Sequence, residues 1–159
     1  LEAVANELAE DGIELISSID YVKDLLAKKG CLTKRKPSEN ETADIKFGWK
    51  IAKEVAGMEI GQCIVVKDRI VLAVEAIEGT NETIKRGGEL GRGKVVVIKL
   101  SKKGQDPRFD VPTIGTETVD YLKEAGVSTL AIEAKKTLIL DKEDTVKLAD
   151  KNKISIIAL

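Results

Sequence analysis

The stretch GQCIVVKDRIVLAVEAIEG, residues 61–79, contains two runs of branched aliphatic residues, CIVV and RIVLAVEAI. Such runs favour β-strands, because branched side chains pack well on a pleated surface. Only Lys67 and Asp68 separate the runs, which is the length and polarity of a tight turn, although the turn has no glycine. We therefore predict a β-hairpin, for which the rest of the chain must supply a sheet.

The residues after this hairpin alternate between helical and strand patterns. The expected helices are 80–90, 117–126 and 142–152, and the expected strands are 94–100, 128–134, 136–141 and 154–159, with 128–134 paired to 136–141. The glycines within 87–93 lack the spacing of a phosphate-binding loop, and we interpret them as a mobile linker. This alternation predicts an α/β fold with a mixed sheet flanked by helices over residues 59–159.

The residues before the hairpin predict a short α/β fragment and a linker helix. The fragment comprises a helix at 1–12 that Gly12 ends, a strand at 13–18 and a helix at 21–30. A polar linker follows, in which Ser38 and Glu41 have the spacing of a capping box, so a helix should run from there to Gly57. We expect three parts: residues 1–30, a linker and bridging helix at 31–58, and a carboxy-terminal domain at 59–159.

Trp49 lies on one face of the predicted bridging helix, together with Ile45, Ala52 and Ala56. This spacing of three or four residues is typical of a helix face that packs on a core. We therefore interpret Trp49 as a core side chain. Stacking of its ring on a ligand base is the alternative.

The charge balance limits the classes of partner. The chain has 159 residues, with 26 Lys and Arg against 27 Asp and Glu, and a formal net charge of −1. A general nucleic-acid-binding protein would need an excess of basic residues, so this class is disfavoured. No apolar run approaches the roughly 20 residues that span a bilayer, and the first residues do not resemble a signal peptide. We expect a cytoplasmic protein.

The absence of histidine excludes several kinds of site. Cys31 and Cys63 are the only cysteines, and the histidine count is zero. Without histidine there is no Ser-His or Cys-His pair, no imidazole base and no usual four-ligand zinc site. A bound metal would be a hard ion held by oxygen, such as magnesium, calcium or manganese. Proton transfer would fall to carboxylates, lysines, tyrosines or water.

The segment SKKGQDPRFDVPTIG, residues 101–115, is dense in ionisable groups. Its two prolines disfavour a helix, so the backbone should be extended or turning. An extended chain would place Asp106, Arg108 and Asp110 on one side. Two carboxylates around a guanidinium suit a phosphate site served by a metal. The alternative is a structural ion-pair cluster on an edge strand.

Glu75 is the second candidate, because it interrupts the apolar run IVLAVEAI. A carboxylate is costly to bury unless it is paired or bound to a metal. Glu78 and Thr80 follow at the strand end, where sites in such sheets gather. Lys99 and Lys102 bracket the end of the next strand and could partner Glu75 or a phosphate. A buried Glu–Lys pair without function is the alternative.

Glu133 occupies the same place in LAIEA, residues 130–134, as Glu75 does in LAVEA, residues 72–76. An echo of five residues is too short to establish an internal duplication. Two lysines follow Glu133 closely, and we interpret this glutamate as part of a polar turn.

Several blocks, taken in order, carry a resemblance to a known family. They are LT at 32–33, PSENETADIKFGW at 37–49, GQCIVVKD at 61–68, LAVEAIEGT at 72–80, KKGQDPRFDVPTIG at 102–115 and LAIEA followed by TLILD. Together they resemble the UDP-2,3-diacylglucosamine pyrophosphatases of the LpxI type, enzymes of lipid A biosynthesis. The blocks AVEAIEGT and GQDxRxDxPTIG are the most specific part of the resemblance.

The resemblance implies a Mg²⁺-dependent hydrolase that splits UDP-2,3-diacylglucosamine into UMP and 2,3-diacylglucosamine 1-phosphate. It places an essential aspartate in the GQDPRFD block, where Asp106 and Asp110 both fit. The metal ligands expected are Asp106, Asp110, Glu75 and Glu78. The substrate-binding residues expected are Arg108, Gln105, Lys102, Thr80 and Lys99.

The resemblance also implies a second domain, with the substrate held between the two. An amino-terminal domain of roughly a hundred residues would precede this chain, residues 1–30 would be its remnant, and 59–159 would be the catalytic domain. A lipid substrate implies peripheral contact with the inner membrane, and a homodimer stays open. Two alternatives remain: a non-catalytic nucleotide- or ligand-binding or assembly module, and a nucleotidyl or sugar-nucleotide transferase.

Overall fold

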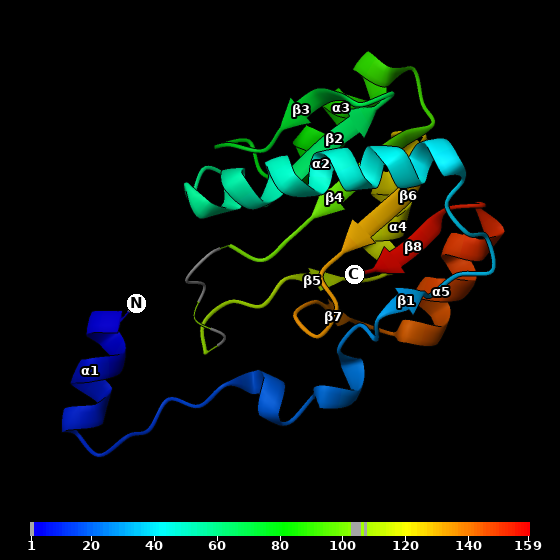
Figure 1. Cartoon of the computed structure of the whole chain (residues 1–159). Helices are drawn as coiled ribbons and strands as arrows, with labels where there is room; N and C mark the ends of the chain where they lie inside the picture. Colours follow the sequence, from blue (N-terminus) through cyan, green and yellow to red (C-terminus); the bar gives the residue numbers. More distant parts are fainter. Residues whose placement is uncertain (1, 103–105, 107) are drawn as a thin grey trace.

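A mixed six-stranded sheet forms the centre of the molecule (Figure 1). The computed structural model describes residues 2–102, 106 and 108–159. The strand order is β1-β8-β6-β4-β2-β3. The strands are β1 (Gly30–Cys31), β2 (Cys63–Lys67), β3 (Ile70–Val74), β4 (Val95–Lys99), β6 (Val127–Ile132) and β8 (Ser155–Ala158). Because β4, β6 and β8 run parallel and β1, β2 and β3 pair antiparallel, the predicted α/β fold with a mixed sheet is confirmed.

The predicted hairpin is confirmed, with its turn one residue later than expected. Asp68 and Arg69 connect β2 to β3, and both have positive φ, 52° and 59°. Paired positive φ values characterise the turn that suits a two-residue hairpin, for which glycine or asparagine is usual. The Asp44 carboxylate accepts the backbone N–H groups of both turn residues, at 3.0 and 2.7 Å. A side chain from another element therefore supports a turn that has no glycine.

Helices cover both faces of the sheet (Figure 1). One face is covered by α2 (Glu39–Gly57), which packs on β2 and β4. The other carries α3 (Thr80–Gly91), α4 (Thr116–Glu124) and α5 (Lys142–Lys151). A separate hydrophobic cluster lies on each face, centred on aliphatic side chains that alternate along the strands. Within the described ranges, no helix has both the length and the apolar character needed to cross a membrane.

The capping box predicted for the long helix is confirmed. The Ser38 hydroxyl accepts the Glu41 N–H at 3.2 Å, and the Glu41 carboxylate accepts the Ser38 N–H at 2.6 Å. The helix ends at Gly57 as predicted. Ile45, Ala52 and Ala56 are buried, whereas Trp49 is only partly buried against the same cluster.

The predictions for residues 13–30 are wrong, although the first helix, α1 (Glu2–Glu10), is confirmed. Residues 13–17 form no strand, because no neighbouring strand pairs with them and Ile13 and Ile16 are half exposed. A 3₁₀ helix, η1 (Ser18–Asp20), precedes residues 21–30. Those residues contain no α-helix, only a second 3₁₀ helix, η2 (Lys23–Leu25). The Ala27 N–H instead donates to the carbonyl of Thr137 at 2.8 Å. Long-range pairing thus overrides the local helical pattern.

The strands predicted at 128–134 and 136–141 exist but do not pair with each other. The first is β6 of the main sheet, and the second is β7 (Leu138–Ile139), which pairs in parallel with β5 (Thr113–Ile114). Lys135, at φ 62°, redirects the chain between β6 and β7. The second, two-stranded sheet therefore forms just after β6 leaves the main sheet.

The glycines expected to form a linker lie inside α3 instead. A Cβ atom at Gly87 would meet the Val65 side chain at 2.5 Å, and one at Gly91 would meet Val95 at 2.2 Å. A Cβ atom at Gly88 would lie 2.2 Å from the Ala125 carbonyl oxygen. These glycines therefore permit α3 to lie unusually close to the sheet and to the end of α4.

Candidate active site

Several of the predicted site residues lie at, or follow directly after, the edge of the sheet formed by the carboxyl ends of β4, β6 and β8. Ligands of α/β proteins usually bind at this edge. The amino termini of α3 and α4 lie at the same edge, after Gly79 and Gly115. A glycine has no side chain to cap the first N–H groups of a helix, so these groups suit an anionic ligand.

Glu75 lies at this edge just beyond β3 and is nearly buried, with 7% of its surface exposed. Its carboxylate accepts the backbone N–H of Gln62 at 3.0 Å and the hydroxyl of Thr80 at 2.9 Å. Glu75 and Thr80 were predicted to belong to one site. The structure brings these two side chains into contact. The side-chain carbonyl oxygen of Gln62 is buried and has no hydrogen-bond partner among the described residues. Such an orphaned polar atom beside a carboxylate is unusual in a purely structural core.

Lys99 ends β4 at the same edge, but it does not form the Glu–Lys pair that was offered as an alternative. Its ammonium donates to the backbone carbonyl of Thr113 at 3.2 Å, and no ion pair with Glu75 is found in the described part of the chain. Thr113 belongs to β5, so Lys99 connects the main sheet to the small second sheet. Sequence reasoning did not identify Thr113 because the contact is a backbone carbonyl.

Cys63 lies opposite Lys99 in the register of β2 and β4 and is completely buried. Burial raises the pKa of the Cys63 thiol far above its usual range, the Glu75 carboxylate raises it further, and Lys99 opposes both. The thiol therefore stays protonated at neutral pH. A protonated, buried thiol is no nucleophile.

The segment after β4 forms a turn at Asp106–Asp110 and not an extended strand. The backbone carbonyl of Asp106 accepts the N–H groups of Phe109 and Asp110, at 3.0 and 3.3 Å. Because the chain turns, the alternation of side chains expected for an extended segment does not apply. Asp110 and Lys102 are exposed, and Gln105 lies outside the described residues.

Asp106 and Arg108 form a bidentate ion pair within this turn. The Arg108 Nε donates to both carboxylate oxygens, at 3.1 and 2.9 Å, and Nη2 donates to one of them at 2.6 Å. The side-chain hydrogen bonds from Arg108 hold the pKa of Asp106 below its usual range. Asp106 is therefore ionised at neutral pH. The guanidinium also lies over the Phe109 ring, 5.5 Å from its centre.

Glu78 is held at the start of α3 by a second ion pair. Its carboxylate accepts the Ala76 N–H at 3.0 Å, the Thr83 hydroxyl at 3.3 Å and the Arg86 guanidinium. A hydrogen bond from its own backbone lowers the pKa of Glu78 most, followed by the bond from Arg86. Arg86 also donates to the Val74 carbonyl at 3.0 Å. This arrangement fixes the loop between β3 and α3.

The carboxylates predicted as metal ligands do not form one large cluster. Throughout residues 2–102, 106 and 108–159, no three carboxylate or thiol side chains come together in a group that could hold a metal ion. Mg²⁺ nevertheless commonly binds through only one or two carboxylates, with water and substrate phosphate completing its shell. Asp106 and Asp110, which share one turn, match that simpler ligand set in donor chemistry. Metal binding by these residues stays a prediction.

Glu133 is the residue that sequence reasoning undervalued. It is 6% exposed at the end of β6, and its carboxylate accepts the Ser101 N–H at 2.8 Å. Lys53 and Lys136 lie 3.4 Å from it. Burial raises the pKa of Glu133, but the Ser101 amide and the two lysines outweigh burial and lower it overall. Glu133 thus anchors the start of the segment that leads to Asp106, and its echo of Glu75 was the available signal.

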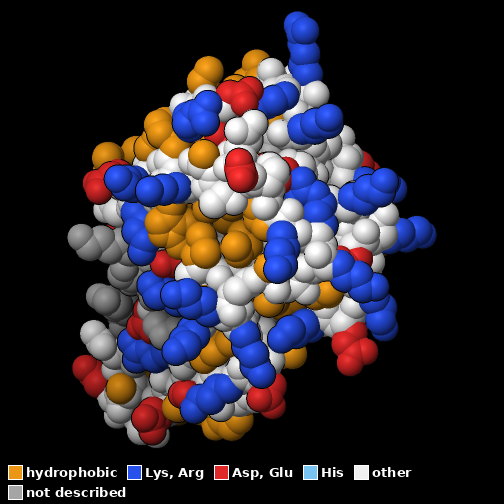
Figure 2. Space-filling view, turned by 45° about the vertical axis from the view of Figure 1, so that its right-hand side comes forward, with side chains coloured by type: hydrophobic (Ala, Val, Ile, Leu, Met, Phe, Trp, Pro, Cys, Tyr) orange, Lys and Arg blue, Asp and Glu red, His pale blue; other side chains and the backbone are white. Residues whose placement is uncertain are grey.

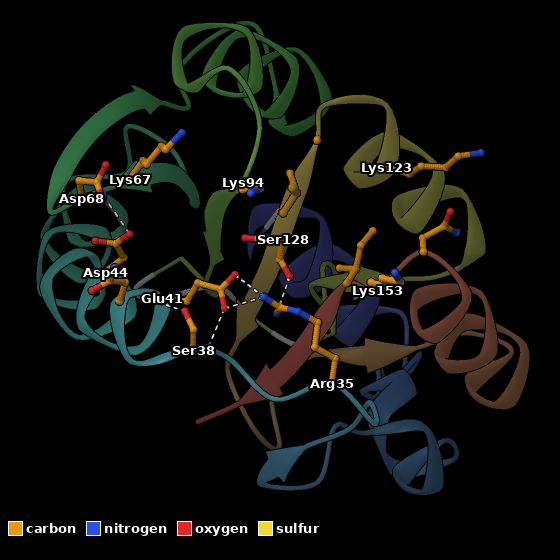
Figure 3. A pocket seen from close by; sticks show the side chains of 15 residues that line it. Arg35, Ser38, Glu41, Asp44, Lys67, Asp68, Lys94, Lys123, Ser128 and Lys153 are labelled. Atoms are coloured by element: carbon orange, nitrogen blue, oxygen red, sulfur yellow. Dashed lines mark hydrogen bonds and ion pairs between the residues drawn. The ribbon is translucent and has the colours of Figure 1, made fainter.

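A cavity of about 600 Å³ lies at the opposite edge of the sheet (Figure 3). Two of the cations that line it, Lys67 and Arg35, are engaged in structure. The Lys67 ammonium donates to the carbonyls of Gly91 and Gly93, at 2.6 and 3.0 Å. Arg35 reaches from one wall to Glu41, at 2.7 and 2.8 Å, and to the Ser128 carbonyl at 3.1 Å. The carboxyl ends of α3, α4 and α5 face this edge, and their partial negative charge accounts for nearby lysines. We therefore place the candidate active site at the other edge.

Comparisons with known proteins show the family of the chain. LpxI, the UDP-2,3-diacylglucosamine pyrophosphatase of Caulobacter vibrioides, is 33% identical over 158 residues, which cover 94% of this chain and 56% of the relative. The bifunctional purine biosynthesis protein PurH of Bacillus subtilis is 31% identical over 130 residues, which cover 79% of this chain and 22% of that protein. The chain thus spans about half the length of LpxI. The family model of the LpxI C-terminal domain matches residues 28–157, and the chain belongs to that family.

Proposed function

We propose that this chain is the carboxy-terminal part of an enzyme that hydrolyses the pyrophosphate bond of UDP-2,3-diacylglucosamine, in lipid A biosynthesis. The products are UMP and 2,3-diacylglucosamine 1-phosphate. The observation that carries this proposal is the Asp106–Asp110 turn beyond β4, at the ligand-binding edge of a domain of the LpxI family. The similarity to LpxI over 94% of the chain supports the substrate.

The chemistry follows from the charge of the substrate. A diphosphate repels nucleophiles, so the main task of the site is to neutralise and align the phosphates. Lys99, Lys102 and the Arg108 guanidinium supply positive charge, and the amino termini of α3 and α4 supply N–H donors. A water oxygen bonds to one phosphorus, the bond from that phosphorus to the bridging oxygen breaks, and one proton is released. Attack at either phosphorus gives the same two products.

The two aspartates of the turn take different roles in this proposal. Asp106 is ionised and held by Arg108, so it contributes fixed charge and is a weak base. Asp110 is the exposed carboxylate and orients the attacking water. Asp106 and Asp110 are the residues that would hold Mg²⁺, and the ion would neutralise negative charge on the phosphates.

The rest of the enzyme forms the second wall of the site. A domain preceding this chain would hold the substrate against the carboxyl edge of the sheet. We also propose a cytoplasmic enzyme that contacts the inner membrane peripherally to reach its lipid substrate.

The test is magnesium-dependent release of UMP from UDP-2,3-diacylglucosamine by the full-length gene product. Asp106→Asn and Asp110→Asn should each lower kcat/KM by about 100-fold or more, as expected for groups at the reacting atoms. Asp120→Asn, an exposed aspartate on α4, is the matched control. Excess EDTA should abolish turnover, and added Mg²⁺ should restore it.

Retention of full activity by both aspartate variants would contradict the assigned roles. Absence of turnover in the wild-type protein, with UMP and Mg²⁺ still bound, would favour the alternative of a non-catalytic binding module. The same assay on residues 1–159 alone shows how much of the activity this part retains.

A further inference from the structure

An apolar groove of about 490 Å³ runs between α2 and the carboxyl ends of β6 and β8. Ile45 and Trp49 line it from α2, and Leu159 and Glu133 line it from the sheet. Its volume falls in the range of small-molecule binding sites. The groove is distinct from the residues that bind phosphate in the proposed mechanism.

The groove exists because α2 is the single helix on this face of the sheet in the described part of the chain (Figure 1). The helix covers β2 and β4, so the more distant β8 is left partly open. Ile157 on β8 is only partly buried, and Leu159 is 42% exposed. Figure 2 shows a face of the molecule on which hydrophobic side chains gather in a patch bordered by Lys and Arg.

Three lysines follow the groove along α2. Lys46, Lys50 and Lys53 are spaced by four and three residues, which places them on one helix face, and all three are exposed. Lys53 pairs with Glu133 at 3.4 Å. Lys46 and Lys50 form no hydrogen bond or ion pair with any residue that the structure describes. An apolar floor beside unpaired cations complements an anionic amphiphile.

We propose that this groove binds an acyl chain of a phosphorylated lipid, with Lys46 and Lys50 attracting its negative charge. The inference rests on the proposed function for the identity of that lipid, the acylated sugar nucleotide. Glu133 connects the groove to the reaction site, because its carboxylate lines the groove and also accepts the Ser101 N–H. Ser101 begins the segment that leads to Asp106, so this one carboxylate contacts both the groove and that segment.

Trp49 gives a direct readout of binding, since it is the only tryptophan of the chain. Monomeric dodecyl phosphate, titrated into the protein, should shift the Trp49 emission to shorter wavelength with saturation. Dodecyl maltoside, which has the same chain without charge, should bind at least about tenfold more weakly. Inorganic phosphate should cause no shift. Equal binding of the two amphiphiles, or no saturable shift, overturns the proposal.

Three variants locate the site. Leu159→Asp places a charge in the groove at a half-exposed residue, so the fold should persist, and it should weaken dodecyl phosphate binding about tenfold or more. The double variant Lys46→Glu/Lys50→Glu should remove the preference for the anionic amphiphile. Lys29→Glu makes a similar change at an exposed lysine outside the groove and should bind as wild type. Unchanged binding in both groove variants overturns the proposal.

A kinetic measurement on the full-length enzyme separates this inference from the proposed function. Leu159→Asp should raise KM for the diacylated substrate by about tenfold, while the slow hydrolysis of an unacylated UDP-sugar stays unchanged. Equal effects on both substrates would contradict an acyl-chain role and leave the hydrolase assignment intact. If the enzyme hydrolyses neither substrate, the proposed function fails and the fluorescence titration still decides the groove.

Discussion

At the scale of single residues, Glu41 links stability to pH. Its carboxylate is nearly buried; burial raises its pKa, but hydrogen bonds led by those from Arg35 outweigh burial and lower it from 4.5 to about 2. The folded pKa is lower than the unfolded pKa, so the stabilisation is complete above pH 4.5 and is lost as the pH falls toward 2. We expect roughly 2–3 kcal/mol of the unfolding free energy to disappear in that window.

Glu41→Gln tests this linkage by urea unfolding at a series of pH values. The variant should be less stable than wild type at pH 7 and should lose less stability between pH 4.5 and 2. Glu39→Gln, an exposed residue in the same helical turn, should follow the wild-type curve. Parallel curves for wild type and Glu41→Gln would rule out this role for the ion pair.

Glu75 is the second residue whose contribution to the unfolding free energy can be measured. Replacement by alanine leaves the Gln62 N–H without its acceptor and the Thr80 hydroxyl without its partner. An unsatisfied buried donor costs about 1–3 kcal/mol, so Glu75→Ala should lower the unfolding free energy by about that amount. Glu75→Gln retains an acceptor oxygen and should lose less. If the two variants are equally stable, the hydrogen bonds contribute little.

Sequence reasoning identified Glu75 and Thr80 as parts of one site but could not identify their partners. Glu75 stands out because it interrupts an apolar run, and this can be recognised without any knowledge of the fold. The partner of Lys99 is a backbone carbonyl on β5, and a carbonyl has no signature in the sequence. Glu133 gave the same signal as Glu75 but was followed by lysines, which made a polar turn the simpler interpretation.

At the scale of elements, the packing of α3 depends on its glycines. Gly87→Ala would place a Cβ atom 2.5 Å from Val65, a branched side chain in the central part of the sheet. Alanine favours the helix by about 1 kcal/mol, but forcing an extra methyl group into a packed core costs about 1–3 kcal/mol. We expect Gly87→Ala to be net destabilising in thermal unfolding. Gly115→Ala is the control, because its Cβ would meet Leu140 at an ordinary 3.5 Å.

The turn between β2 and β3 shows the opposite situation, because residues other than glycine adopt positive φ there. Arg69 has φ 59°, a conformation that disfavours residues with a Cβ atom, and Asp44 compensates through two hydrogen bonds. Asp44→Ala should therefore destabilise the protein by about 1–3 kcal/mol. Arg69→Gly, which relieves the backbone, should recover part of that loss in the double variant. A double variant no more stable than Asp44→Ala would refute this compensation.

Element types were predictable where the local pattern and the tertiary environment agree. The capping box of α2, the β2–β3 hairpin and the strands at β4, β6 and β8 are examples. The pattern failed at residues 13–30, where Ala27 forms long-range backbone hydrogen bonds with Lys135 and Thr137 in place of helical ones. The sequence pattern also failed for the glycines of α3. Glycine is common in flexible linkers and also where a helix packs closely on its neighbours, so the sequence alone does not separate the two cases.

At the scale of the whole molecule, the first residues contribute little to the core. Ala5 is the single buried hydrophobic residue among the described residues before Ala27. Removal of residues 1–17 should therefore change the unfolding free energy by less than about 1 kcal/mol. Removal of residues 1–31 deletes β1 and its pairing with β8, and it should destabilise the protein substantially. Similar losses in the two truncations, measured by urea unfolding, would show that α1 is part of the cooperative unit.

The glycine content of α3 also determines when this helix forms during folding. Three glycines in twelve residues leave this helix with little stability of its own, so it should form only after β2 and β4 offer a surface to dock on. Mutations in α3 should then accelerate unfolding and leave the refolding rate nearly unchanged. Because the first turn of α3 carries Thr80, the contact with Glu75 would be among the last made as the chain acquires its native structure.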